Sequence, residues 1–192
     1  MGSSKEIEVK FRVKKLSVLT RDLRKAGFHV ETTRTHETNV LYDLPGRDLQ
    51  KHGELLRLRK YGKECVLTHK AKGSVRRHKS RIETETRVAD GKKMDAILRA
   101  LGYEPTFRYE KFRTAWSDGK GHVVVDETPI GNFGEIEGPA RWIDQAAWRL
   151  GISPKDYITE TYVGLFFRWK QETGSSASEM TFKAVRRGKR IS

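Results

Sequence analysis

Charged and apolar residues alternate over residues 6–13, which read Glu-Ile-Glu-Val-Lys-Phe-Arg-Val. Successive side chains of a β-strand point to opposite faces, so Glu6, Glu8 and Lys10 would share one face. Two carboxylates followed by a cation suit a metal ion that is held beside an anion. This segment is therefore the first candidate for chemistry in the chain.

The same alternation recurs at five later places. These are Arg57-Leu58-Arg59, Lys70-Ala71-Lys72, Arg81-Ile82-Glu83-Thr84-Glu85, Lys111-Phe112-Arg113 and Glu135-Ile136-Glu137. A single such strand is weak evidence, because a half-buried strand ordinarily turns its charges to solvent. Six of them in one chain indicate that the charged faces converge.

The carboxylates come in close pairs, at 6 and 8 and at 135 and 137, with Asp126 shortly upstream of the second pair. Packed together they would repel one another, and their pKa values would rise. A divalent cation removes that repulsion. Mg²⁺ or Mn²⁺ is expected, since both prefer oxygen ligands and commonly bridge carboxylates to phosphates.

The cations have the density that a polyphosphate requires. Arginine binds phosphate oxygens through a two-pronged fork, and lysine acts as a point charge. The three-residue patterns at 57–59, 70–72 and 111–113 would supply six such groups, with Lys10 beside the carboxylates. Arg81, Glu83 and Glu85 support two interpretations equally: part of this site, or internal ion pairs that orient its cations.

Composition limits the class of protein. The 192 residues suffice for one domain with a core, and a net charge of +14 predicts an anionic partner. Cys65 is the single cysteine, which excludes an intramolecular disulfide and a cysteine zinc site. No apolar run is long enough to span a membrane, and residues 1–5 lack the apolar stretch of a signal peptide. A cytoplasmic monomer or homodimer that does not bind membranes is expected.

Helical spacing of apolar residues appears at 16–27, 91–102 and 142–150, and a last helix is expected at 156–170. These helices would cover the apolar faces of the strands, so the charged faces must point elsewhere. Antiparallel strands that curl into a closed or nearly closed β-barrel satisfy both demands. The interior would be charged, with the helices packed outside.

The chain divides at residue 172 by composition. Residues 1–172 form the expected barrel domain, and residues 173–192 form a basic tail that is expected to be disordered. The tail's cations are Lys183, Arg186, Arg187, Lys189 and Arg190. Nucleic acid is a possible partner only through this tail, where binding would be blind to sequence.

Taken in chain order, the motifs resemble the CYTH superfamily, also called the triphosphate tunnel metalloenzymes. This superfamily includes class IV adenylyl cyclases, thiamine triphosphatases and inorganic tripolyphosphatases. The resemblance runs from Glu6 to about Trp169. It rests on Glu-X-Glu-X-Lys at 6–10, Arg-X-Arg at 57–59, Lys-X-Lys at 70–72, Arg-X-Glu-X-Glu at 81–85, Lys-X-Arg at 111–113, and Asp126 followed by Glu-X-Glu at 135–137.

The resemblance implies an α+β fold, in which an eight-stranded antiparallel β-barrel forms a tunnel whose end is closed by the last helix. It implies catalytic roles for Glu6, Glu8 and Lys10. The implied metal ligands are Glu6, Glu8, Asp126, Glu135 and Glu137. The implied triphosphate-binding residues are Lys10, Arg57, Arg59, Lys70, Lys72, Lys111 and Arg113, supported by Arg81, Glu83 and Glu85.

Three functions follow from these residues. Hydrolysis of a phosphoanhydride in tripolyphosphate, thiamine triphosphate or a nucleoside triphosphate is favoured. The alternative is a class IV adenylyl cyclase that converts ATP to cyclic AMP and pyrophosphate, but such cyclases often carry His-Phe before the glutamates, where this chain has Lys5. A further alternative is a module that binds polyphosphate or RNA, although clustered carboxylates would repel phosphate without a metal.

Overall fold

The computed structural model describes residues 4–75 and 77–188. Its strands are β1 (Ser4–Val13), β2 (His29–Asp43), β3 (Leu55–Tyr61), β4 (Glu64–Lys70), β5 (Ser74–Val75), β6 (Lys79–Arg87), β7 (Glu104–Ser117), β8 (His122–Thr128) and β9 (Gly131–Glu137). Its helices are α1 (Leu16–Lys25), α2 (Asp48–His52), α3 (Gly91–Ala100), α4 (Ala140–Arg149), the 3₁₀ turn η1 (Pro154–Asp156), α5 (Tyr162–Thr173) and α6 (Phe182–Gly188).

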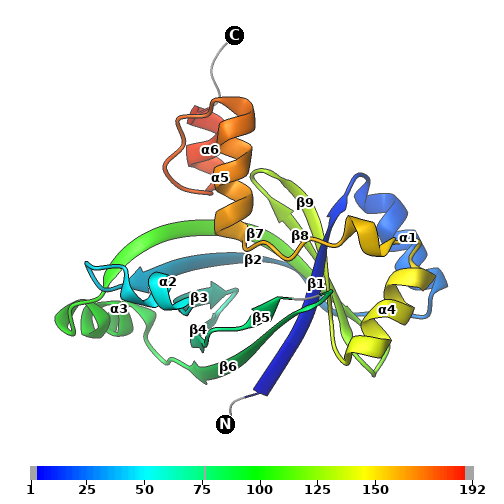
Figure 1. Cartoon of the computed structure of the whole chain (residues 1–192), viewed down its shortest axis with the longest axis horizontal. Helices are drawn as coiled ribbons and strands as arrows, with labels where there is room; N and C mark the ends of the chain where they lie inside the picture. The colour runs from blue at the N-terminus through cyan, green and yellow to red at the C-terminus, as the bar shows by residue number, and fades with distance from the viewer. Residues whose placement is uncertain (1–3, 76, 189–192) are drawn as a thin grey trace.

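The strands form one antiparallel barrel (Figure 1). Neighbours run in the order β1-β9-β8-β7-β2-β3-β4-β6, and β6 pairs with β1 to close the ring. At this seam Glu6 lies opposite Arg81, and Glu8 lies opposite Lys79. The short β5 pairs with the first residues of β6, where Ser74 lies opposite Ser80 and Val75 opposite Lys79. The expected closed, eight-stranded antiparallel barrel is thereby confirmed.

Alternation along the strands gives the barrel an apolar outside. Val9 and Phe11 of β1 and Ile136 of β9 are buried beneath α1 and α4, whose Leu23 and Ile143 are fully covered. On another side, α3 covers the outer face of β3. The helices therefore pack outside, as expected. Among the described residues, no helix has both the length and the apolar character needed to cross a membrane.

Helix α5 closes one end of the barrel. Its Tyr162 and Phe166 pack against Phe133 of β9 and Phe107 of β7. The expected start of this helix at Asp156 is wrong. Residues 157–161 stay extended, because the backbone of Ile158 exchanges two hydrogen bonds with Lys10, at 3.1 and 2.7 Å.

The segment after α5 is folded, which corrects the expectation of a disordered tail for residues 174–188. Met180 forms a parallel bridge with Tyr109, and the backbone N–H of Phe182 donates to Glu110 at 2.6 Å. Ala177, Met180 and Val185 are buried in the cluster that holds α5. Three apolar anchors therefore order a stretch that is otherwise polar. Lys189 and Arg190 lie outside the described residues.

Met180→Ala is expected to lower the free energy of unfolding by about 2–4 kcal/mol, since the side chain is fully buried between α5, α6 and the barrel. Urea unfolding followed by circular dichroism measures the change. Lys183→Ala, at an exposed position of α6, is the control and should stay close to the wild type. A loss below about 0.5 kcal/mol for Met180→Ala would show that this segment does not stabilise the barrel.

Candidate functional site

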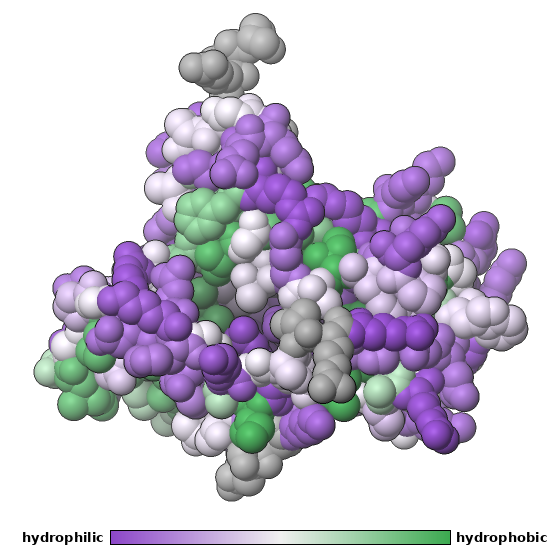
Figure 2. Space-filling model, viewed as in Figure 1, coloured by the Kyte–Doolittle hydropathy of each residue, from purple (hydrophilic) through white to green (hydrophobic). Residues whose placement is uncertain are grey.

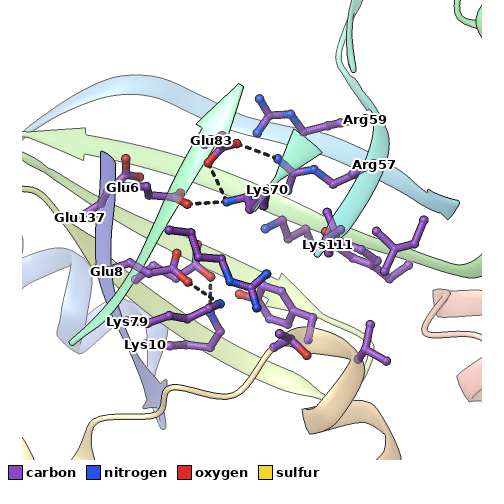
Figure 3. Close-up of a pocket in the computed structure, with 18 of the residues that line it drawn as sticks. Glu6, Glu8, Lys10, Arg57, Arg59, Lys70, Lys79, Glu83, Lys111 and Glu137 are labelled. Carbon is purple, nitrogen blue, oxygen red and sulfur yellow. Dashed lines mark hydrogen bonds and ion pairs between the residues drawn. The ribbon is translucent and has the colours of Figure 1, made fainter. Parts of the chain in front are cut away.

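A charged cavity of about 480 Å³ occupies the inside of the barrel (Figure 3). Six strands turn ionisable side chains into it, because residues two apart on a strand share a face. The charged lining consists of Glu6, Glu8, Lys10, Arg57, Arg59, Lys70, Lys79, Arg81, Glu83, Glu85, Lys111, Arg113, Glu135 and Glu137. The charged interior predicted from sequence is therefore present.

Four carboxylates crowd together along the pairing of β1 with β9. Its register sets Glu8 directly opposite Glu137, and Lys10 opposite Glu135. Like charges across a strand pair repel. Burial raises the pKa of Glu137 to about 7, and the neighbouring carboxylates of Glu6, Glu8 and Glu135 add to this rise.

A second crowded pair spans the seam between β1 and β6. Burial raises the pKa of Glu83 to about 8, with Glu6 adding to the shift and Lys70 opposing it. The Lys70 ammonium lies between the two carboxylates, 2.6 Å from Glu6 Oε2 and 2.8 Å from Glu83 Oε2 (Figure 3). Although burial disfavours its ionised form, Glu6 has a lowered pKa because of this lysine.

Lysines neutralise the remaining carboxylates. Lys10 is buried and paired with Glu135, and Lys79 Nζ lies 2.9 Å from Glu8 Oε1. Desolvation opposes the charge on Lys10, but Glu135 and Glu8 hold its pKa above the ordinary value. Glu6, Glu8, Glu83 and Glu135 therefore each have a lysine partner, which another cation could replace, whereas no ion pair of Glu137 is found among the described residues.

Two arginines present unused donors. Arg57 NH2 lies 3.3 Å from Thr68 Oγ1, and Arg59 NH2 lies 3.4 Å from Glu85 Oε1. Within the part of the chain that the structure describes, the buried Nε atoms of both arginines lack a hydrogen-bond partner. A buried donor without a partner is costly. Both guanidinium groups line the cavity, and their NH2 atoms make only long contacts, so these atoms can bind an anion that enters it.

A deeper network supports the lining from β2, β8 and α5. Asp126 is fully buried and accepts hydrogen bonds from Lys111 (2.8 Å), from Arg113 (2.7 and 2.6 Å) and from the Tyr162 hydroxyl (2.6 Å). Glu37 Oε1 lies 3.4 Å from Lys111 Nζ. Burial opposes ionisation of Glu37, yet Lys111 and Arg113 lower its pKa to about 2.

Most of the predicted site residues are brought together. Those that line the cavity are Glu6, Glu8, Lys10, Arg57, Arg59, Lys70, Lys111, Arg113, Glu135 and Glu137, with Arg81, Glu83 and Glu85. Asp126 lies beneath Arg113 instead of in the lining, with both oxygens engaged. Lys72 lies beyond the end of β4 and is exposed, near Gly53.

Three contributors were not predicted. Lys79 precedes Arg81 by two residues, so the same alternation could have revealed it. Glu37 is an isolated charge in a threonine-rich strand, and its role in the site becomes evident only from its ion pair with Lys111. Tyr162 lies in the cavity wall, with the Lys10 and Lys111 ammonium groups 4.5 and 4.7 Å from its ring centre. No pattern in the sequence marks a helical tyrosine for this position.

The donor set fits a hard divalent cation. Among the described residues, no preformed group of three or more His, Cys, Asp or Glu side chains has the arrangement of a metal site. The crowded carboxylates of Glu6, Glu8 and Glu137 nevertheless offer oxygen ligands alone, with an elevated pKa at Glu137. This chemistry suits Mg²⁺ or Mn²⁺.

The charge of the lining sets what can bind. Eight cationic and six carboxylate side chains from the described residues face the cavity, an excess of two positive charges when all of them are ionised. A triphosphate carries about four negative charges near neutral pH. One divalent cation together with this excess would balance such a ligand.

Comparison with known proteins agrees with this geometry. The chain matches the CYTH domain family over residues 4–162. It is 25% identical over 168 residues to the adenylate cyclase CyaB of Aeromonas hydrophila, which covers 82% of this chain and 86% of that protein.

Solved structures share the fold. A candidate adenylate cyclase from Vibrio parahaemolyticus aligns with a TM-score of 0.77 at 21% identity, covering 86% of this chain and 99% of the other. HpAC1 from Hippeastrum is a candidate adenylyl cyclase described as revealing a dominant triphosphatase activity. It aligns with a TM-score of 0.61 at 19% identity, covering 85% of this chain and 95% of the other. With its family match, its closed barrel and its charged cavity, the chain belongs to the CYTH domain family.

Proposed function

We propose that this protein is a metal-dependent hydrolase that cleaves a phosphoanhydride bond of a triphosphate. The observation that carries the proposal is a single cavity whose wall combines the loosely bonded guanidinium groups of Arg57 and Arg59 with carboxylates that repel one another. Arginines alone would suit any anion. Carboxylates beside them suit a phosphate chain that is bound together with a metal ion.

The chain's own residues divide into two groups. Lys10, Arg57, Arg59, Lys70, Lys111 and Arg113 bind the phosphate oxygens. Glu6, Glu8, Glu135 and Glu137 would hold Mg²⁺ or Mn²⁺, which supplies charge neutralisation and activation of water when bound. Asp126 acts from below by orienting Arg113 and Lys111 through the hydrogen bonds described above. A direct role for Asp126 as a metal ligand, which the resemblance implies, would require it to give up these partners.

Binding is an exchange of ionic partners. Lys70 and Lys79 now neutralise Glu6 and Glu8. If Glu6 and Glu8 were to hold a metal ion, the Lys70 and Lys79 ammonium groups would become available to phosphate oxygens. These four side chains would thus stay paired in both states, which limits the free-energy penalty of holding their charges away from water.

Cyclisation of ATP is the second candidate, because relatives such as CyaB of Aeromonas hydrophila are named adenylate cyclases. The same cations and carboxylates would serve attack by a ribose hydroxyl on the α-phosphorus. The triphosphatase activity described for Hippeastrum HpAC1 favours hydrolysis within this fold. Products separate the two functions directly.

Purified protein incubated with ATP and Mg²⁺ or Mn²⁺ is expected to release ADP and phosphate, and to release phosphate and pyrophosphate from tripolyphosphate. Excess EDTA should abolish both reactions, since the carboxylates would lose their metal ion. Anion-exchange chromatography of the products is the measurement. Cyclic AMP with pyrophosphate as the main ATP products would establish cyclisation instead. Activity that persists in EDTA would contradict the metal-dependent proposal.

Glu8→Gln is expected to lower turnover at least about 100-fold, because it removes a charged metal ligand while keeping the shape of the side chain. The fold should persist, since the change relieves repulsion with Glu137. Steady-state kinetics at saturating metal tests this, with circular dichroism to check folding. Glu104→Gln, an exposed position at the start of β7, is the matched control. Near-normal turnover in Glu8→Gln would remove this residue from the site.

Arg57→Ala is expected to weaken tripolyphosphate binding about 10- to 100-fold, because a charge-assisted contact is lost. Inorganic phosphate, which is too short to span the cavity, should lose less. Titration calorimetry with both ligands gives the two dissociation constants. Arg87→Ala, at an exposed end of β6, is the matched control. Equal losses for both ligands would mean that Arg57 does not contact the polyphosphate chain.

A further inference from the structure

A dense group of cations lies on the outside of the barrel, on α1 and the two residues that precede it. The group consists of Lys14, Lys15, Arg21, Arg24 and Lys25, all of which are exposed, and we call it the α1 patch. Asp22 is the one carboxylate within residues 14–25, so five cations against one acid give this segment +4 of the chain's net charge of +14. Figure 2 shows hydrophilic residues gathered on the side of the molecule where Figure 1 places α1 and α4.

The charges of the α1 patch are almost unpaired, in contrast to those of the cavity. Among the described residues, its one ion pair joins Arg21 to the adjacent Asp22 at 2.9 Å. Such an exposed pair contributes little and is screened by salt. Arg149 donates to the carbonyl of Ala26, just after α1, and occupies the nearby carboxylate of Asp118. The patch therefore keeps its positive charge at the surface.

The cations at the start of α1 lie where they disfavour the helix. Lys15 occupies the N-cap position, no side chain caps this end, and the first turn holds no acidic residue. A helix N-terminus carries a partial positive charge, and Ser, Thr, Asp or Asn is preferred at the N-cap. Residues that break a local rule of stability without a compensating contact are expected to serve function.

The geometry of the α1 patch fits a chain of phosphates. Leu19 and Leu23 are buried against the barrel, so the exposed Arg21, Arg24 and Lys25 lie on the remaining sides of the helix. The ten residues of α1 span about 15 Å, a length over which one strand of a duplex places about four phosphates. Successive cations can therefore each meet a phosphate group.

The composition of this face favours a nucleic acid over a membrane or a protein. Helices that lie on membranes insert large apolar side chains. Helix α1, which the structure describes in full, exposes one such residue, Val18, at 39%, because its leucines pack on the barrel. Protein interfaces are depleted in lysine and enriched in aromatic residues. Non-specific contact with a phosphate backbone needs only cations.

We propose that the α1 patch binds the phosphate backbone of a nucleic acid without reading its sequence. The patch is separate from the proposed hydrolase site, since none of its five cations lines the cavity. Nucleic acid would thus meet the first helix, and not the C-terminal tail where the composition placed it.

Fluorescence anisotropy tests this binding with a labelled RNA that carries a 5′-hydroxyl group, so that no triphosphate end can enter the cavity. Full-length protein is titrated in EDTA at about 50–200 mM salt, and a dissociation constant of about 1–100 µM is expected near physiological salt. The logarithm of the affinity should fall against the logarithm of the salt concentration with a slope of about −3, because each phosphate contact contributes about −0.7.

The triple variant Lys14→Gln, Lys15→Gln, Lys25→Gln should bind RNA at least about 10-fold more weakly at about 50 mM salt, with a slope about 2 units shallower, since three contacts are lost. The matched control is Lys63→Gln, Lys92→Gln, Lys93→Gln, which removes the same charge at exposed lysines of the β3–β4 turn and α3. It should stay within about threefold of the wild type, because only the long-range field changes. Circular dichroism checks that both variants fold.

Three results would overturn the proposal. They are the absence of RNA binding by the wild type, equal weakening by the two triple variants, and loss of binding when the chain is ended at Gly188, which would assign the contact to residues 189–192. Sedimentation with vesicles that contain about 30% phosphatidylserine tests the membrane alternative. Binding to vesicles through the same lysines, without binding to RNA, would also overturn it. Turnover plays no part in these measurements, so failure of the proposed hydrolase function would leave their outcome unchanged.

Discussion

The structure depends on keeping opposite charges paired inside a closed barrel. An isolated ion buried away from water is very unfavourable, so a barrel can have a charged interior only if every ion finds a partner. Lys10 with Glu135, Lys70 with Glu6 and Glu83, and Lys79 with Glu8 meet this requirement, and Glu137 avoids it in part because burial raises its pKa to about 7 and so favours its neutral form. The apolar side chains must then face outward, and that is why the helices lie outside the barrel and not within it.

The same pairing makes the interior responsive. Each ion in the cavity has a defined position, but its partner can be replaced by another ion that carries the same charge as that partner. Crowding shows in the pKa values of Glu83 and Glu137, raised to about 8 and about 7. Stability and ligand binding therefore depend on the same residues. The ion pairs that stabilise the barrel interior are those that a metal ion and a phosphate chain would replace on binding. Asp126 differs from these residues, because its hydrogen bonds position the side chains of Arg113 and Lys111.

Alternation in the sequence predicted the barrel and most of its lining, because a period of two assigns each strand residue to a face without further information. The prediction was weaker where a role depends on distant partners. Glu37 matters through Lys111, and Tyr162 reaches the cavity only because residues 157–161 are extended by pairing with Lys10. In the sequence, Lys72 continues the alternation of Lys70, but strand β4 ends at Lys70, so the alternation no longer decides where Lys72 points. Residues 174–188 are mostly small or polar, so their composition did not predict that Ala177, Met180 and Val185 are buried.

The seam of the barrel has a consequence for how the protein reaches its active form. Strand β1 pairs with β6 and β9, which lie far along the chain: Glu8 meets Lys79 on one side and Glu137 on the other. Joining such distant segments requires large loops to close, and that loss of entropy slows folding. One of these neighbours, β9, is the last strand of the barrel to be synthesised, and it carries Glu135 and Glu137 of the site. A nascent chain released before residue 137 would lack half of this arrangement, so chemistry in this cavity is coupled to completion of the fold.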